Sequence, residues 1–257
     1  TDGSVVTWGS STKGGNSECA PPTCAAAPAG SLASGVTQIF ATEQAFAALK
    51  SDGSVVTWGV DSYGGNSSSV AGQLSSGVTQ VFSGTLAFAA LKTGGSVVTW
   101  GYSLGGGNSS AVAGQLASGV TQIFAAEYAF AALKSNGSVV TWGDSSSGGD
   151  SACASAGCTA APAGSLASGV SQIFSTDSAF VALKADGSVV TWGDATKGGS
   201  SSTVASQLAS GVVQIFSTST AFAALKADGS VVTWGDAGYG SDSSAVASQL
   251  ASGVAQV

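Results

Sequence analysis

Three short apolar runs recur along the chain in a fixed order, each bounded by polar or glycine-rich residues. The first reads G-V-T-Q-I-F at residues 35–40, the second A-F-A-A-L-K at 45–50 and the third S-V-V-T-W-G at 54–59. Each run is rich in Val, Ile, Phe or Trp, so each predicts a β-strand. A Ser-Asp-Gly triplet joins the last two, which indicates a tight hairpin because Asp and Gly tolerate positive φ. Both faces of the runs are apolar, which predicts sheets covered on both sides.

The tryptophan of the third run marks the repeat, with spacings of 50 or 42 residues between copies: Trp8, Trp58, Trp100, Trp142, Trp192 and Trp234. A long period with several strands per unit is typical of radial arrays of small sheets. We therefore predict an all-β fold, a six-bladed β-propeller with three- to four-stranded blades. Residues 1–257 form one domain in this interpretation, with units that start near residues 3, 53, 95, 137, 187 and 229. The tryptophans are interpreted as core side chains between blades.

Two further regularities refine this prediction. A shift of three units maps Cys19 onto Cys153 and Cys24 onto Cys158, which indicates a duplicated three-blade module. The chain is also shorter than six full units by the copy of residues 216–226, so we expect one blade to be incomplete by one strand. Whether that strand comes from the same chain or from a neighbouring molecule stays open.

A family resemblance rests on the same residues. The phrase A-L-K-x-D-G-S-V-V-T-W-G, followed by S-G-V-x-Q-I, resembles the regulator-of-chromosome-condensation (RCC1-like) repeat. The short period is similar to the compact blades of β-lactamase inhibitory protein II. The resemblance implies a propeller fold. Chromatin-binding, nucleotide-exchange members of the first group act through basic and His-containing elements, and this chain has no Arg and no His.

Composition narrows the function classes. Only 8% of residues are charged, and the formal net charge is −7. Without His the commonest general base and metal ligand is missing. Without Arg, and with an acidic balance, nucleic acid is not an expected partner. We predict no enzyme activity, no cofactor and no metal, and no run is long enough for a membrane span.

Variation among the copies points to a binding surface. The hairpin turns hardly vary, whereas the loops at the other end of the strands differ in every copy, as expected for a scaffold that presents a surface. Drift of unconstrained loops would give the same variation. Tyr is a favoured interface residue, and acidic side chains suit a cationic partner. The candidate binding residues are Tyr63, Tyr102, Tyr128, Tyr239, Glu43, Asp144, Asp177, Asp194 and Asp236.

The four cysteines fall in two C-x4-C insertions, which predicts local disulfides between Cys19 and Cys24 and between Cys153 and Cys158. Disulfides form in oxidising compartments, so we expect an extracellular or cell-surface location. Zinc is the alternative, but it takes about four ligands and each insertion offers two thiols.

The best interpretation is a non-enzymatic exported or cell-surface propeller that binds a protein or glycan partner through its variable loops. The alternative is a structural repeat module of a surface layer or extracellular filament, self-associated through strand donation. A hydrolase with carboxylates near a central channel is a third interpretation, although the sequence carries no catalytic phrase.

Overall fold

The computed structural model describes residues 2–10, 13, 15–18, 23–153 and 155–257. The described residues form seventeen β-strands, one short α-helix and eight 3-10 turns. They divide into two compact units, Thr1–Tyr128 and Ala129–Val257. The single domain of six blades therefore stays a prediction.

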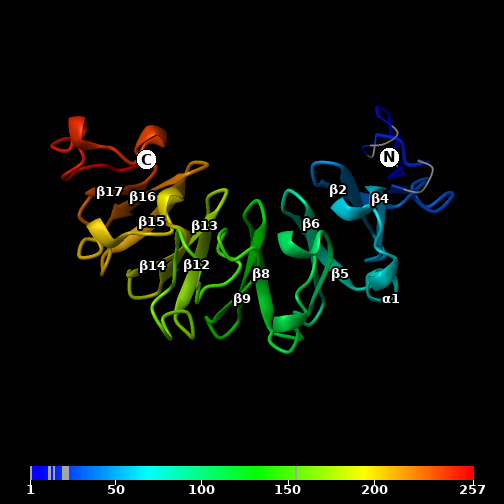
Figure 1. The fold of residues 1–257 in the computed structure, drawn as a ribbon, viewed down its shortest axis with the longest axis horizontal. Helices are drawn as coiled ribbons and strands as arrows, with labels where there is room; N and C mark the ends of the chain where they lie inside the picture. Colours follow the sequence, from blue (N-terminus) through cyan, green and yellow to red (C-terminus); the bar gives the residue numbers. More distant parts are fainter. Residues whose placement is uncertain (1, 11–12, 14, 19–22, 154) are drawn as a thin grey trace. The chain divides into compact units, whose positions relative to one another are not determined.

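The three predicted runs are the strands of a recurring three-stranded sheet (Figure 1). The first strands are β2 Val36–Ala41, β5 Val78–Ser83, β8 Val120–Ala125, β12 Val170–Ser175 and β15 Val212–Ser217. The second strands are β3 Ala45–Lys50, β6 Ala87–Lys92, β9 Ala129–Lys134, β13 Ala179–Lys184 and β16 Ala221–Lys226. The third strands are β4 Val55–Val60, β7 Val97–Gly101, β10 Val139–Gly143, β14 Val189–Asp194 and β17 Val231–Gly235.

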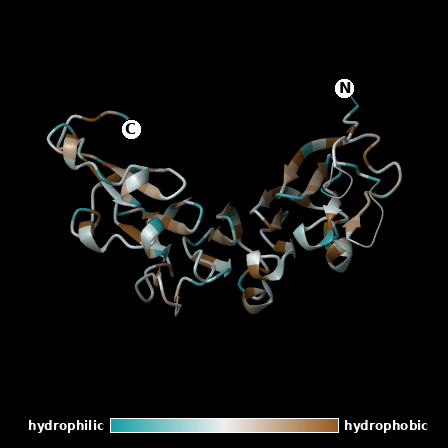
Figure 2. Ribbon diagram, turned by 45° about the horizontal axis from the view of Figure 1, so that its top comes forward, coloured by the Kyte–Doolittle hydropathy of each residue, from teal (hydrophilic) through white to brown (hydrophobic). Residues whose placement is uncertain are grey.

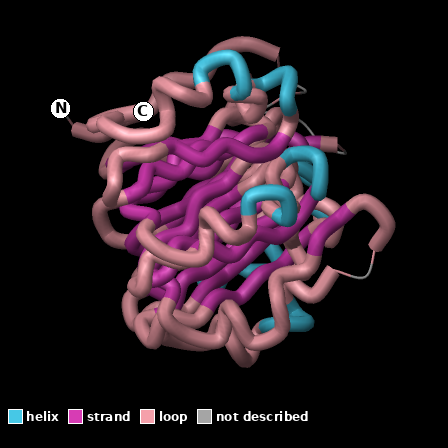
Figure 3. The backbone as a smooth tube through the Cα atoms, turned by 90° about the vertical axis from the view of Figure 1, so that its left-hand side faces the viewer, coloured by secondary structure: helices cyan, strands magenta, loops and turns pink. Residues whose placement is uncertain are grey.

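Within each unit, neighbouring strands are antiparallel. The first unit holds sheets of order β1-β4-β3-β2 and β5-β6-β7, and it ends with strand β8. The second unit opens with the β9–β10 hairpin and continues with sheets β11-β14-β13-β12 and β15-β16-β17. Figure 3 shows the strands side by side, with loops at both ends. The predicted strand order and hairpins are confirmed.

Short turns connect the third strand to the next first strand. A 3-10 turn follows most tryptophans, namely η1 Asp61–Tyr63, η3 Ser103–Gly105, η5 Ala195–Lys197 and η7 Ala237–Tyr239. A second 3-10 turn comes about seven residues later, namely η2 Ser68–Val70, η4 Ser110–Val112, η6 Ser202–Val204 and η8 Ser244–Val246. The one α-helix among the described residues, α1 Ala71–Leu74, follows η2.

The core of each sheet is a Phe–Trp pair that the hairpin register creates. Phe88 of β6 faces Trp100 of β7, and their rings stack with centroids 5.2 Å apart. The four other described pairs, Phe46–Trp58, Phe130–Trp142, Phe180–Trp192 and Phe222–Trp234, have centroid distances of 5.3 to 5.5 Å. The apolar strands stand out in the hydropathy colours of Figure 2. Large aromatic rings contribute most of the buried apolar area in such small sheets.

Three of the described Phe–Trp pairs also receive the Gly-Gly turn of the preceding repeat. The Nε1 of Trp100 donates to the carbonyl of Gly64 at 3.0 Å, and Trp192 and Trp234 donate in the same way to Gly148 and Gly198. Gly64 has φ +94°, and a Cβ there would lie 2.6 Å from a ring carbon of Phe88. The glycine is required both by its backbone conformation and by the close approach of the ring.

Two predictions about burial are corrected. The second strands are buried, but the first strands expose the polar side chains of their T-Q or S-Q dipeptides, so the sheets are not apolar on both sides throughout. Trp8 is 82% exposed and residues 5–8 form no strand, although the five other tryptophans are at most 4% exposed. The reason is that no A-F-A-A-L-K strand among the described residues lies beside this copy of the third run.

The two insertions supply a fourth strand to the sheet that follows each of them. Strand β1 Cys24–Ala25 pairs with β4, and β11 Cys158–Thr159 pairs with β14, in the same register. This accounts for the predicted mixture of three- and four-stranded sheets. The insertions therefore cover the outer edge of β4 and β14.

Candidate functional site

The variable loops join the first strand to the second in every repeat, at the end of the sheets opposite the hairpin turns. We call this the loop end; its loops are residues 42–44, 84–86, 126–128, 176–178 and 218–220. Threonine closes several of these loops. The hydroxyl of Thr42 accepts from the amide of Ala45 at 3.1 Å and donates to the carbonyl of Tyr63 at 3.0 Å. The loop and the turn after the tryptophan are thereby fixed to each other.

Backbone hydrogen bonds align successive loops. The amide of Glu43 donates to the carbonyl of Thr85 at 3.0 Å, and the amide of Thr85 donates to the carbonyl of Glu127 at 2.8 Å. In the second unit the amide of Asp177 donates to the carbonyl of Ser219 at 2.9 Å. The middle residue of each of these loops thus stands next to its counterpart in the following repeat of the same unit. Within each unit, the side chains at this position therefore form a row along hydrogen-bonded loops.

In the first unit three candidate residues, Tyr63, Glu43 and Tyr128, lie near a second acid, Glu127. Tyr128 lies within electrostatic range of Glu127, Glu43 and Tyr63, and the negative charge of Glu127, followed by burial and by Glu43, raises the pKa of the Tyr128 phenol. We call Tyr63, Glu43, Thr85, Glu127 and Tyr128 the acidic tyrosine patch. It combines two carboxylates with two phenol rings and contains no lysine.

Glu127 was not among the residues predicted from the sequence. The sequence did contain a signal for Glu127, because Glu127 holds the same loop position as the candidate Glu43 two repeats earlier. What the repeat alignment could not supply is the contact between successive loops. That contact comes from backbone hydrogen bonds that carry no sequence signature.

Three of the predicted binding acids have a local role instead. The carboxylates of Asp194 and Asp236 accept from the amides of Thr196 and Gly238 at 2.8 Å and cap the following 3-10 turns. Asp144 accepts from the amide of Ser147 at 3.0 Å and from the hydroxyl of Ser146. A side-chain oxygen that accepts from a backbone amide at a turn start stabilises that turn. These acids are explained by the fold without a ligand.

The remaining candidates are not among the groups that act on the Tyr128 phenol. Tyr102 precedes η3 and is 42% exposed, close in sequence to the exposed Leu104. Tyr239 ends η7 in the second unit and is 59% exposed. Asp177 is partly buried in the loop of residues 176–178. Lys197 takes the place that Tyr63 has in the first unit, because its carbonyl accepts from the hydroxyl of Thr176.

The hairpin end is occupied by structural hydrogen bonds. The carboxylate of Asp52 accepts from the hydroxyl and the amide of Ser54, which lowers the pKa of Asp52 with a smaller contribution from Lys50. The ammonium of Lys50 donates to the carbonyl of Ser31 at 3.0 Å. The copies at Lys184 and Lys226 make the equivalent bond. The uniformity of this end follows from its shared structural role.

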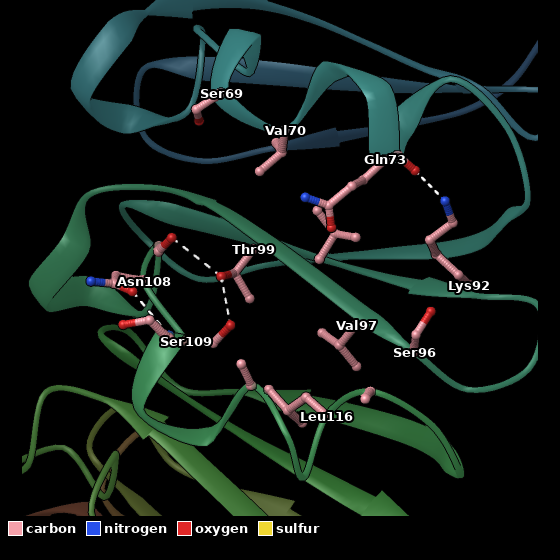
Figure 4. A pocket seen from close by; sticks show the side chains of 15 residues that line it. Ser69, Val70, Gln73, Lys92, Ser96, Val97, Thr99, Asn108, Ser109 and Leu116 are labelled. Atoms are coloured by element: carbon pink, nitrogen blue, oxygen red, sulfur yellow. Dashed lines mark hydrogen bonds between the residues drawn. The ribbon is translucent and has the colours of Figure 1, made fainter.

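A polar groove of about 540 Å³ runs between α1 and the outer edge of β7 (Figure 4). Thr99 lies at its centre and donates to the carbonyl of Gly107, and its hydroxyl also contacts that of Ser109. A groove of about 550 Å³ with equivalent lining, including Thr233 and Gln207, occurs in the second unit. The hydroxyls of both threonines bond within the protein. The groove is therefore a feature of the repeat, and we assign no ligand to it.

One of the two predicted disulfides lies wholly within the described residues. A disulfide joins Cys153 to Cys158. Cys24 is also disulfide-bonded, but Cys19 lies outside the described residues, so the predicted Cys19–Cys24 pair stays a prediction. The disulfide closes the insertion that carries β11, and it thereby fixes the two-residue strand against β14.

The described part of the chain contains no group of three or more His, Cys, Asp or Glu side chains placed to hold a metal ion. None of the helices found there has the length and apolar character that crossing a bilayer requires.

No protein-family description and no curated protein sequence matches the chain. Several solved structures are similar to the chain. Human WBSCR16 has a TM-score of 0.50 at 20% identity, covering 78% of this chain and 61% of that one. Prp20p, the RCC1 of Saccharomyces cerevisiae, has a TM-score of 0.46 at 17% identity, covering 78% and 58%. The ectodomain of the receptor kinase CR4 of Physcomitrella patens has a TM-score of 0.46 at 16% identity, covering 78% and 50%.

The chain thus aligns with between 50% and 61% of the length of these three structures. At such identities the likeness shows the fold alone. The finer similarity to β-lactamase inhibitory protein II stays a prediction, as does the number of blades. The recurring three-stranded antiparallel sheets and the likeness to human WBSCR16 identify the fold as the predicted RCC1-like β-propeller fold.

Proposed function

We propose that this chain is a non-enzymatic binding protein whose acidic tyrosine patch holds a cationic segment of a protein partner. The observation that carries the proposal is the convergence of Glu43, Glu127, Tyr63 and Tyr128, from different repeats, around one phenol group. The patch lies on loops that backbone hydrogen bonds hold in place.

The chemistry of the patch favours a cation. The two carboxylates attract lysine or arginine side chains, and phenol rings bind the same groups through their π faces. The raised pKa of Tyr128 reflects a negative local potential, and a bound cation would relieve it. A protein segment is preferred over a glycan because tyrosines that supply contact area beside charged groups are typical of protein interfaces.

We further propose an extracellular or cell-surface location. The support is the Cys153–Cys158 disulfide, since structural disulfides persist mainly in oxidising compartments. The acidic, lysine-poor patch also argues against a nucleic-acid partner, because phosphates would be repelled by the two carboxylates.

The proposal is tested with a short oligolysine peptide as the probe and an oligoglutamate peptide of equal length as its counterpart. Isothermal titration should detect oligolysine binding that weakens as salt increases, and no binding of oligoglutamate. The double variant Glu43→Gln/Glu127→Gln should lower the affinity about tenfold, because exposed ion pairs each contribute roughly 0.2–1 kcal/mol.

A matched control changes charge by the same amount at the hairpin end. The variant Asp2→Asn/Asp52→Asn removes two exposed carboxylates from turns of the same unit. Oligolysine affinity in this variant should stay within about twofold of the parent chain, a free-energy difference of roughly 0.4 kcal/mol. Equal losses in both double variants would show a diffuse charge effect and would overturn the proposal.

A further inference from the structure

The turn η3 places a leucine in water at a position that holds no large side chain in the other repeats. Leu104 is 65% exposed, and Tyr102, the residue before η3, is 42% exposed. The residues equivalent to Leu104 are small: Thr12, Ser62, Ser146, Thr196 and Gly238. The loop end therefore carries exposed apolar area at this one turn.

The same turn lacks a stabilising cap that three other turns have. The residues equivalent to Tyr102 in those turns are Asp144, Asp194 and Asp236, and each carboxylate accepts from an amide of the turn. Tyr102 makes no such bond. Val60, which also makes none, is partly buried, whereas Tyr102 is exposed. A residue that replaces a cap without a compensating contact is typical of a functional position.

Gly105 brings two apolar side chains together beside this turn. Its equivalents in the other described repeats carry side chains, namely Tyr63, Ser147, Lys197 and Tyr239. A Cβ at Gly105 would lie 3.2 Å from the Cβ of Leu86 and 3.6 Å from Cδ1 of the Tyr102 ring. The amide of Tyr102 also donates to the carbonyl of Leu86 at 3.0 Å. We call Leu86, Tyr102 and Leu104 the apolar cluster.

The apolar cluster adjoins the acidic tyrosine patch. Leu86 directly follows Thr85, and backbone hydrogen bonds place Thr85 between Glu43 and Glu127. The cluster thus begins one residue away from the row that carries the two carboxylates. A peptide held by those carboxylates would have neighbouring side chains within reach of Leu86 and the turn η3.

From these observations we propose that the apolar cluster binds a large apolar side chain, of leucine or phenylalanine size, that lies next to the basic residues of the partner segment. This inference rests on the function proposed above and adds specificity to it. The carboxylates select the basic residues by charge, and the leucine and tyrosine side chains supply the apolar contact. An apolar anchor beside polar contacts is the usual composition of a protein interface.

The probes are two peptides of equal length and charge, K-K-K-L-K-K-K and K-K-K-G-K-K-K. In isothermal titration the leucine peptide should bind about fivefold more tightly, because part of its apolar side chain leaves water. Both affinities should fall as salt increases, while their ratio persists. Equal affinities would overturn the inference and leave the cation site standing. Binding of neither peptide would overturn both proposals.

The variant Leu104→Ser is the protein-side control, because it gives the turn the residue that Ser62 and Ser146 supply elsewhere. It should bring the ratio of the two affinities close to one and leave the glycine peptide within about twofold of its original affinity. The double variant Glu43→Gln/Glu127→Gln should weaken both peptides and keep their ratio. A ratio unchanged in Leu104→Ser would overturn the inference.

A second copy of this chain is the competing occupant of the apolar cluster. Sedimentation equilibrium should give the parent chain and Leu104→Ser the same mass. Self-association of the parent chain that is lost in Leu104→Ser would show that the cluster binds another copy, and would overturn the inference.

Discussion

At the residue scale, hydroxyl side chains supply structural hydrogen bonds in a chain that has few charged residues. In the first strands a register shift places one residue out of line, and its hydroxyl bonds across the sheet: Thr37 to Leu49 at 3.0 Å, and Thr79 to Leu91 at 3.1 Å. A bulge leaves backbone groups without a ladder partner, and the hydroxyl satisfies one of them. Ser171 does the same for Leu183.

Val213 occupies this bulge position in β15 and is 55% exposed, with no hydroxyl to offer. The change Val213→Thr should stabilise the chain by about 0.5–1 kcal/mol through a new hydrogen bond to the carbonyl of Leu225. The reverse change Thr79→Val should destabilise it by a similar amount. Urea denaturation measures both free energies of unfolding. A loss of stability in Val213→Thr would show that the bulge hydroxyl is not the stabilising element.

The Asp-Gly-Ser turns predict a pH dependence. Hydrogen bonds from Ser54, Ser188 and Ser230 lower the pKa of Asp52, Asp186 and Asp228 in the folded chain. A carboxyl whose folded pKa is below its unfolded value stabilises the fold above that unfolded value, and this contribution is lost as the pH falls through the folded pKa. Stability should therefore decrease below about pH 4, the ordinary range of aspartate.

Replacing the three serines by alanine removes the largest cause of the shifts, so the triple variant should lose less stability on acidification than the parent chain. Melting temperatures measured between neutral pH and pH 3 compare the two slopes. The same acid slope in both proteins would contradict this assignment.

At the element scale, the sequence predicted almost every strand because three signals coincide: apolar runs of strand length, Asp-Gly hairpins and glycines after each tryptophan. It failed at residues 4–8, where the local pattern is intact but the pairing strand is absent from the described residues. A strand needs its neighbour as well as its own composition, since backbone groups are satisfied only across the ladder. The exposure of Trp8 is the result.

The glycine after the first 3-10 turn of a repeat, such as Gly64, has a left-handed backbone and lies against an aromatic ring. Gly64→Ala should destabilise the chain by about 2 kcal/mol or more, because a Cβ meets Phe88 and because φ is positive. Gly72→Ala is the matched control. Gly72 lies in α1 with open space around it, so alanine should stabilise that helix by roughly 0.5–1 kcal/mol. Equal effects in the two variants, measured by chemical denaturation, would refute the packing role of Gly64.

At the scale of the whole molecule, the features that recur from repeat to repeat are distinct from those that vary among the repeats. Lysines, hairpin turns, bulge hydroxyls and Phe–Trp pairs recur from repeat to repeat, and each has a structural hydrogen bond or packing contact. Of the candidate binding residues, Asp144, Asp194 and Asp236 also proved to be turn caps. Sequence comparison of the copies could find variable positions, but it could not tell a cap from a contact residue. That distinction needs the geometry of the turn.

After this sorting the acidic tyrosine patch remains, in which Glu43, Glu127, Tyr63 and Tyr128 come from different repeats. Tyr102, Tyr239 and Asp177 also remain, but they are not part of it. None of these side chains is needed to explain a hairpin, a bulge or a cap. The patch is thus the part of the loop end that a partner best accounts for.

The most direct test of this account is the footprint of bound oligolysine on the isotope-labelled chain, followed by NMR. We expect shift changes confined to residues 42–44, 84–86 and 126–128 and to Tyr63, together with a fall in the pKa of the Tyr128 phenol when the cation binds. A footprint centred on the hairpin turns or on the second unit, or an unchanged Tyr128 pKa at saturation, would contradict the account.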